Sequence, residues 1–144
     1  MNVPGLRSPY EQVGGIYHFA RMLDKIQLHA AGNLPADYQT NLGEGFDAGV
    51  CRLVGMKYED VVARVKQGGT DAEILTWCFQ NGRTPAEHER TWFNEYLRKR
   101  GWNDVASERL VERVKTLGPQ WAGQVRTFFD VIEVDEGRPP RAKV

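Results

Sequence analysis

The sequence predicts an all-α fold: a single compact domain of six or seven helices, packed as an orthogonal or irregular bundle. Apolar residues recur at intervals of three and four, which places them on one face of a helix. Ser or Thr followed three residues later by Glu, a pattern typical of helix starts, occurs three times. Glycines follow the periodic segments, as they do at helix ends, and convincing period-two alternation is absent.

The first predicted helix begins with a capping box at Ser8 and Glu11 and ends before Gly32. Its apolar stripe comprises Ile16, Phe19, Ala20, Leu23, Ile26 and Ala30. The pair Gly14–Gly15 lies one turn into this helix, where each glycine costs roughly 1 kcal/mol relative to alanine. Either the helix restarts at this pair, or a ligand or another backbone approaches it closely.

Residues 32–45 form the longest predicted connection, which suits either a binding loop or a plain surface excursion. Capping boxes at Thr70 and Thr84 begin two further helices. Residues 135–144 are polar and Pro-rich and are predicted to be a disordered tail, which leaves residues 1–134 as the helical domain. Glycines predicted to end helices are Gly55, Gly68, Gly82, Gly101 and Gly118. The later apolar stripes are Val61, Val62 and Val65; Trp92, Phe93, Tyr96 and Leu97; Leu110, Val111, Val114 and Leu117; and Trp121, Val125, Phe128, Phe129 and Ile132.

Composition and charge argue against several classes of protein. Lys plus Arg and Asp plus Glu number 19 each among 144 residues, so no net field attracts nucleic acid or an anionic membrane. No apolar stretch approaches the ~20 residues that span a bilayer. The two cysteines, Cys51 and Cys78, form no CxxC motif, which argues against a disulfide scaffold or a zinc module. A cytoplasmic location follows by elimination.

Motifs for metals, cofactors and nucleophiles are absent from the sequence. His18 and His29 lie about three helical turns apart, roughly 16 Å, which is too far to share an ion. The sequence has no HExxH, P-loop, GxGxxG or GxSxG motif, and neither cysteine has a histidine nearby. We therefore expect no metal and no cofactor, and no catalytic residue is identified.

One flank of the first helix carries polar residues at the edge of its apolar stripe. Arg21 and Asp24 are neighbours at i, i+3, and Gln27 lies beside them. A helical wheel places Lys25, with His18 and His29, on the opposite face, where they are expected to meet water. Polar groups at an apolar edge need hydrogen-bond partners, which either another helix or a polar ligand can supply.

Two segments carry a family resemblance: RSP-x-E-x-x-GG at residues 7–15 and AR-x-x-DK at residues 20–25. They resemble an uncharacterised bacterial domain-of-unknown-function family of about this length. The similarity continues to about residue 118, with departures at Lys57 and at residues 26–28. The resemblance implies a compact helical intracellular protein and supplies no activity. It also implies that Arg7, Gly14, Gly15, Arg21, Asp24 and Lys25 act as one unit.

Two functions are compatible with this organisation. The first is a cytosolic structural or interaction module, in which the polar Arg/Asp network fixes the packing of the first helix. The second is a small-molecule binding protein or metal-independent acid–base enzyme, whose flank would hold an anionic or carbonyl ligand. A small polar ligand and a second copy of the chain are the partners that these functions allow. The ligand-binding candidates are Arg7, Arg21, Asp24, Lys25, Gln27 and Trp77.

Overall fold

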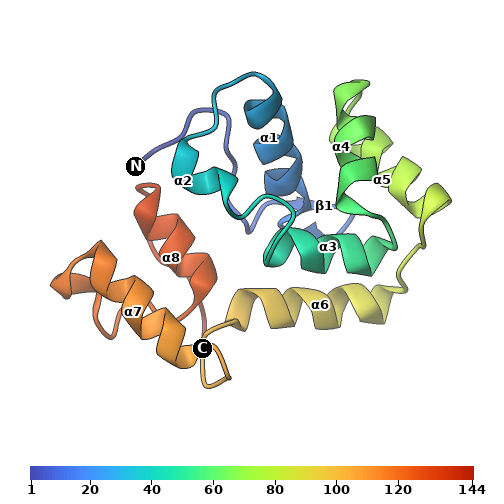
Figure 1. Ribbon diagram of the computed structural model, residues 1–144. Coiled ribbons are helices and arrows are strands. Elements are labelled where there is room, and N and C mark those ends of the chain that lie inside the picture. The colour runs from blue at the N-terminus through green and yellow to red at the C-terminus, as the bar shows by residue number, and fades with distance from the viewer. The chain divides into compact units, whose positions relative to one another are not determined.

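The computed structural model describes all residues from 1 to 144 and is mostly helical, which confirms the predicted fold class (Figure 1). It has eight α-helices, of which α2 is a single turn, together with a two-stranded sheet and one 3₁₀ helix, η1. The elements are β1 (Gln12–Val13), β2 (Ile16–Tyr17), α1 (Phe19–Ala30), α2 (Ala36–Gln39), α3 (Phe46–Val54), α4 (Tyr58–Lys66), α5 (Asp71–Asn81), α6 (Glu87–Lys99), α7 (Ser107–Leu117), η1 (Pro119–Trp121) and α8 (Phe128–Asp135).

The internal contacts of the chain divide it into two compact units. The larger unit is Gly5–Phe93, and the smaller one combines Met1–Pro4 with Asn94–Val144. In the larger unit α1 contacts α3, α4 and β1, and α4 lies beside α5. In the smaller unit α7 contacts both α8 and η1.

The predicted start of the first helix is wrong. Residues 12–17 form an antiparallel hairpin in which Val13 pairs with Ile16, and α1 begins only at Phe19. Gly14 and Gly15 make the two-residue turn with φ of 57° and 75°, and only glycine adopts two such values readily, so the turn competes successfully with a helix. The close neighbour of this pair is a side chain and neither a ligand nor another backbone: a Cβ on Gly14 would lie 2.3 Å from Cδ2 of Leu75.

The three predicted capping boxes have different outcomes. Thr70 caps α5 as expected, with its hydroxyl accepting from the amide of Glu73 and the Glu73 carboxylate accepting from the amide of Thr70. Ser8 begins no helix, and its hydroxyl accepts from the amide of Tyr10 in a turn. Near Thr84, the carboxylate of Glu89 accepts from the amide of Ala86, and α6 begins one residue after Ala86.

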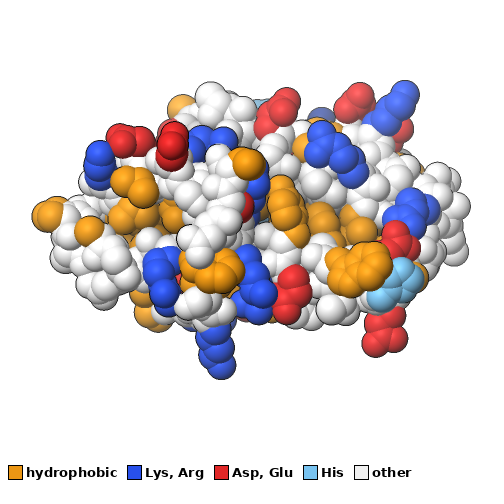
Figure 2. All heavy atoms as spheres, turned by 90° about the horizontal axis from the view of Figure 1, so that it is seen from below, with side chains coloured by type: hydrophobic (Ala, Val, Ile, Leu, Met, Phe, Trp, Pro, Cys, Tyr) orange, Lys and Arg blue, Asp and Glu red, His pale blue; other side chains and the backbone are white.

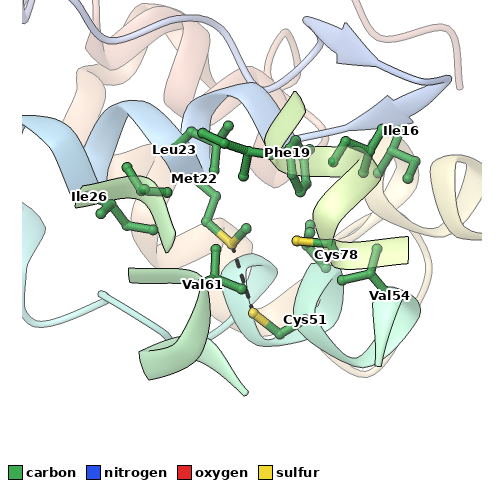
Figure 3. Packing of buried hydrophobic residues seen from close by; sticks show 13 residues of the cluster. Ile16, Phe19, Met22, Leu23, Ile26, Cys51, Val54, Val61 and Cys78 are labelled. Carbon is green, nitrogen blue, oxygen red and sulfur yellow. Dashed lines mark hydrogen bonds between the residues drawn. The ribbon is translucent and has the colours of Figure 1, made fainter. Parts of the chain in front are cut away.

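The hydrophobic core of the larger unit is built around α1 (Figure 3). Phe19, Met22 and Leu23 are fully buried there, and α3, α4 and α5 supply the facing side chains. Cys51 of α3 points at Met22, with the two sulfur atoms 3.9 Å apart. The first two turns of α1, Phe19 to Ile26, are buried without exception, so this helix has no solvent face until its last turn.

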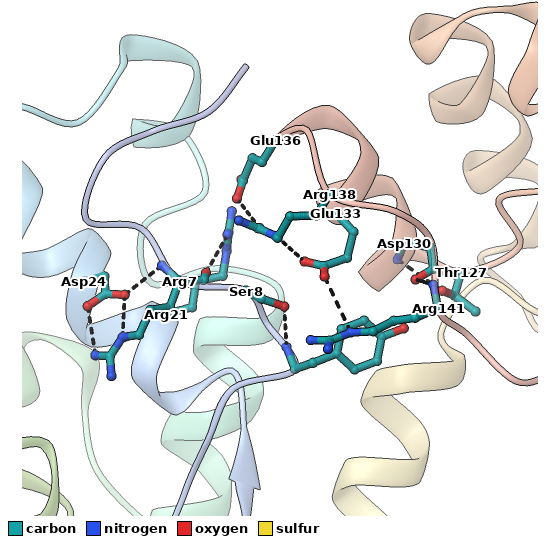
Figure 4. Close-up of polar contacts among 11 residues, drawn as sticks. Arg7, Ser8, Arg21, Asp24, Thr127, Asp130, Glu133, Glu136, Arg138 and Arg141 are labelled. Atoms are coloured by element: carbon teal, nitrogen blue, oxygen red, sulfur yellow. Dashed lines mark hydrogen bonds and ion pairs between the residues drawn. The ribbon is translucent and has the colours of Figure 1, made fainter.

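The smaller unit has its own core, formed by Leu110, Val114, Val125 and Val131. Buried acidic residues of α8 and its C-cap hold residues 138, 141 and 142, part of the tail for which composition predicts disorder (Figure 4). Arg138 donates to Glu133 at 2.8 Å and to Glu136 at 2.6 Å. The Asp130 carboxylate accepts the amides of Arg141 and Ala142.

Acidic and basic side chains are interspersed on the face shown in Figure 2, with hydrophobic side chains between them. Two members of the apolar stripe predicted for α6 are exposed, Trp92 at 68% and Tyr96 at 53%, whereas Leu97 is buried. No helix has the length and apolar character needed to cross a bilayer.

Candidate functional site

His18 occupies an unusual position directly before α1. Its φ of 70° lies in the left-handed region, which few residues other than glycine adopt and which costs of order 1–3 kcal/mol. Its amide donates to the carbonyl of Pro9, and its own carbonyl accepts the amide of Met22, both at 2.9 Å. The side chain is 2% exposed and contacts the edge of the Phe46 ring. The backbone therefore holds the imidazole inside the larger unit.

Asp47, in the first turn of α3, is the fully buried centre of a charged cluster. Its Oδ1 lies 2.7 Å from Nε2 of His18, and its Oδ2 accepts from Nζ of Lys25 at 2.8 Å. The amide of Gly43, in the loop before α3, also donates to Oδ2. Three donors thus converge on one carboxylate: two from α1 and its N-cap, and one from the loop before α3.

The charge states of the cluster follow from this geometry. Burial alone would raise the pKa of Asp47, but the hydrogen bond from His18 and the charge of Lys25 outweigh it and lower that pKa. Burial lowers the pKa of His18, and the charges of Lys25 and Arg21 add to the effect, while Asp47 opposes it. At neutral pH the carboxylate is therefore ionised and the imidazole neutral. Nε2 must carry the ring proton, because it faces a carboxylate that can only accept.

The other ring nitrogen of His18 has no hydrogen-bond partner. Nδ1 is buried and, in the tautomer that Asp47 selects, presents a bare lone pair. Leaving a buried polar atom unsatisfied costs about 1–3 kcal/mol. Such atoms are rare in folded proteins, so this one calls for a partner such as a water molecule or a ligand.

A second polar network ties the N-terminal segment to α1 (Figure 4) and, through Asp71, to α5. The guanidinium of Arg7 makes two bonds of 2.9 Å to Asp24 and one of 2.6 Å to Asp71. The amide of Arg7 also donates to Asp24, and Arg21 donates to the carbonyl of Arg7 at 3.0 Å. In this way protein groups satisfy the carboxylate of Asp24, which was a ligand candidate.

The other residues that the sequence suggested for a site lie in different surroundings in the structure. Lys25 and His18, which the helical wheel placed in water, are buried at 6% and 2% exposure, because α3 packs on that side of α1. Gln27 was expected at the apolar edge but is exposed, since it lies beyond the two buried turns. Trp77 is partly buried and packs against the core of the larger unit.

Sequence reasoning missed Asp47 and misplaced His18. Asp47 is 29 residues from its histidine partner, so no local pattern connects the two. Two signals were available: Asp47 lies two residues after the glycine-rich loop at residues 32–45, and the family resemblance continues through Phe46 and Asp47.

The two cysteines offer no reactive thiol. Both are free and buried, and burial raises the pKa of Cys51 to about 12 and that of Cys78 to about 11. Thiolate is the nucleophilic form of cysteine, and it is scarce at neutral pH for such groups. No group of three or more His, Cys, Asp or Glu side chains is arranged to hold a metal ion.

Fold and site together define a small, mostly helical protein with a buried histidine–aspartate–lysine cluster. The chain belongs to a family described as Domain of unknown function (DUF5069), whose model matches residues 3–138 and so includes most of both compact units. This match confirms membership of a domain-of-unknown-function family. A search of curated proteins found no match.

Proposed function

We propose that the chain binds a small polar ligand at the imidazole of His18, without a metal. The observation that carries this proposal is the buried Nδ1 atom with no hydrogen-bond partner. The left-handed backbone of His18 supports it, because strained residues cluster at functional sites. The ion pair of Asp47 with Lys25 also supports it, since it keeps the charge of the carboxylate and thereby fixes the imidazole tautomer.

The chemistry of the lone pair selects the class of ligand. A bare Nδ1 accepts hydrogen bonds, so the ligand must present a donor such as a hydroxyl or an amide N–H. Ketones and esters without a hydroxyl or N–H group have only acceptors and are disfavoured in this protonation state. The guanidinium of Arg7, which could otherwise hold an anion, already donates to Asp24 and Asp71.

The same geometry suits general-base chemistry. A neutral imidazole can take the proton of a bound donor, and the imidazolium so formed would be stabilised by Asp47, 2.7 Å from Nε2. In this role His18 is the base and Asp47 is the residue that positions it. Lys25 holds Asp47 in its charged form.

The test is a nitrogen NMR experiment on protein labelled with ¹⁵N in its histidine rings. We expect His18 to show a protonated Nε2 and a bare Nδ1 at pH 7.5. A set of hydroxyl- and amide-bearing fragments should shift the Nδ1 resonance, whereas ketones and esters of similar size should not. Equal responses to both sets, or no response to either, would reject the proposed site.

A matched pair of variants connects the binding to His18. His18→Asn keeps a residue that tolerates positive φ but removes the imidazole, and His29→Gln changes an exposed histidine on the last turn of α1. Donor-bearing fragments should raise the melting temperature of the wild type and of His29→Gln, but not that of His18→Asn.

A second candidate function is a structural or interaction module, as the polar network on the first helix suggested. It is favoured by the partners of Arg7, which donates to Asp24 and Asp71 and so joins three segments of the larger unit. Under this function, Arg21→Ala or Asp24→Asn would reduce folding stability and leave ligand-dependent thermal shifts unchanged. A structural or interaction module of this kind could also associate with a second copy of the chain.

A cytoplasmic location is part of the proposal, supported by the two free, buried cysteines. The balance of 19 basic and 19 acidic residues supports the absence of nucleic-acid and membrane partners.

A further inference from the structure

The charges around His18 suggest how the proposed ligand site responds to acid. The charged groups that act on the ring are Asp47 from α3 and Lys25 and Arg21 from α1. Asp47 lies on the Nε2 side and already carries an ion pair with Lys25. A proton added at Nδ1 therefore creates a positive charge in a buried place where two cations already act.

We propose that below neutral pH the His18 site binds a small monovalent anion together with one proton. The proton bonds to Nδ1, and the new Nδ1–H donates to the anion, so the buried site gains no net charge. Nε2–H continues to donate to Asp47 Oδ1, which holds the ring in the same orientation in both states. Lys25 and Arg21, which oppose protonation alone, favour the anion that accompanies it.

The size and charge of the anion follow from the surroundings of the ring. Only one positive charge is added, so one negative charge balances it, and a dianion such as sulfate would leave the buried site with an excess. The His18 side chain is 2% exposed and lies against Phe46, so the anion must be small. Formate meets both requirements and presents two acceptor oxygens.

This inference rests on the proposed function in one respect, namely that Nδ1 is open to a ligand. It adds the regulation of that site: a hydrogen-bond donor at neutral pH is exchanged for a proton and an anion in acid. Linkage then requires the affinity for the anion to fall about tenfold for each unit by which the pH rises above the pKa of His18.

The experiment titrates the ¹⁵N-histidine-labelled chain with sodium formate at pH 5.5, 6.5 and 7.5. Ionic strength is held constant with sodium gluconate, whose bulk keeps it out of a buried site. We expect formate to move the His18 Nδ1 resonance from the bare to the protonated range at pH 5.5. The dissociation constant should rise about tenfold per pH unit above the pKa, and His29→Gln should behave as the wild type does.

Three outcomes would overturn the proposal: formate affinity that does not depend on pH, formate binding that persists in His18→Asn, or an Nδ1 resonance that formate does not move. The measurement on the wild type alone is decisive if His18→Asn fails to fold. If donor-bearing fragments still bind at pH 7.5, only the anion proposal fails. If neither fragments nor formate reach Nδ1, the proposed function fails with it.

Discussion

At the scale of single residues, Asp47 is the group on which the buried cluster depends. It is fully buried and carries the charge that Lys25, at 6% exposure, requires. Asp47→Asn would leave the ammonium without a counter-charge, which destabilises a fold by about 3–5 kcal/mol when both partners are buried. Urea denaturation at pH 7.5 measures the loss. Asp37→Asn, on the exposed side of α2, is the control and should stay within about 0.5 kcal/mol of the wild type.

The neutral imidazole of His18 should make the folded chain less stable in acid. Burial, with Lys25 and Arg21, lowers the pKa of His18 below its ordinary value of 6.5. Below pH 6.5 the His18 of the unfolded chain takes up a proton that the folded chain does not bind, which favours unfolding. The contribution of the neutral imidazole to the stability of the folded chain is therefore fully present above pH 6.5. It is lost as the pH falls through the lower pKa of the folded state, with a slope of up to about 1.4 kcal/mol per pH unit.

Urea denaturation between pH 5 and 8, in buffers without small anions, measures this slope. His18→Asn should remove the slope, whereas His29→Gln should retain it because His29 is exposed. A slope that is equal in all three proteins would show that His18 is not the group responsible.

At the scale of elements, the capping box of α5 can be compared with one that did not form. Thr70→Ala removes the hydroxyl that accepts from the amide of Glu73, and it should cost about 1 kcal/mol. Thr84→Ala changes a residue with the same sequence signature but no cap, and it should cost less than about 0.5 kcal/mol. Equal losses in chemical denaturation would contradict the assigned start of α6.

The end of α5 packs against the end of α3 at a glycine. A Cβ on Gly82 would lie 2.0 Å from the carbonyl oxygen of Val54, which accepts the amide of Arg83 at 2.7 Å. Because that oxygen belongs to the backbone, Gly82→Ala must move one helix end and should cost about 1–3 kcal/mol. Gly32→Ala is the control: its φ of 75° resists alanine, but its Cβ would meet open space, so about 1 kcal/mol is expected. Thermal unfolding compares the two variants.

The sequence predicts helices well where one face is buried and poorly where a helix is enclosed. The stripe of α7 and the cap at Thr70 are local patterns: Thr70 caps α5 as predicted, and Leu110, Val114 and Leu117 lie in or against the core, whereas Val111 of the same stripe is exposed. In contrast, the wheel of α1 assumed a solvent face, yet α3 and α4 enclose its first two turns. For this reason the wheel could not place Lys25 and His18 in the cluster. The hairpin was missed because strands of two residues are too short to show alternation.

At the scale of the whole molecule, the charged clusters of the larger unit join residues from distant parts of the chain. Asp47 meets His18 across 29 residues, and Asp71 meets Arg7 across 64. Sequence patterns identify which polar residues need partners, as they did for Arg21 and Asp24, because that need follows from local burial. They cannot identify the partner, which depends on how the helices pack. The family match, over residues 3–138, likewise defines membership without an activity.

The C-terminal tail makes contacts that its amino-acid composition does not predict. Its Pro-rich sequence predicts disorder, yet Arg138 donates to Glu133 and Glu136, which are 2% and 4% exposed. Deleting residues 138–144 would leave these acids buried without their cation, so we expect a loss of about 3 kcal/mol or more in chemical denaturation.

A shorter deletion, of residues 143–144, is the control for the tail. It keeps Arg138 and the amides of Arg141 and Ala142 that donate to Asp130, so stability should stay within about 0.5 kcal/mol of the wild type. If both deletions leave stability unchanged, the tail contributes nothing to folding and composition predicts it correctly. If only the longer one destabilises, buried acidic residues of α8 and its C-cap hold a segment whose own sequence has no tendency to fold, because ion pairs with buried carboxylates outweigh composition.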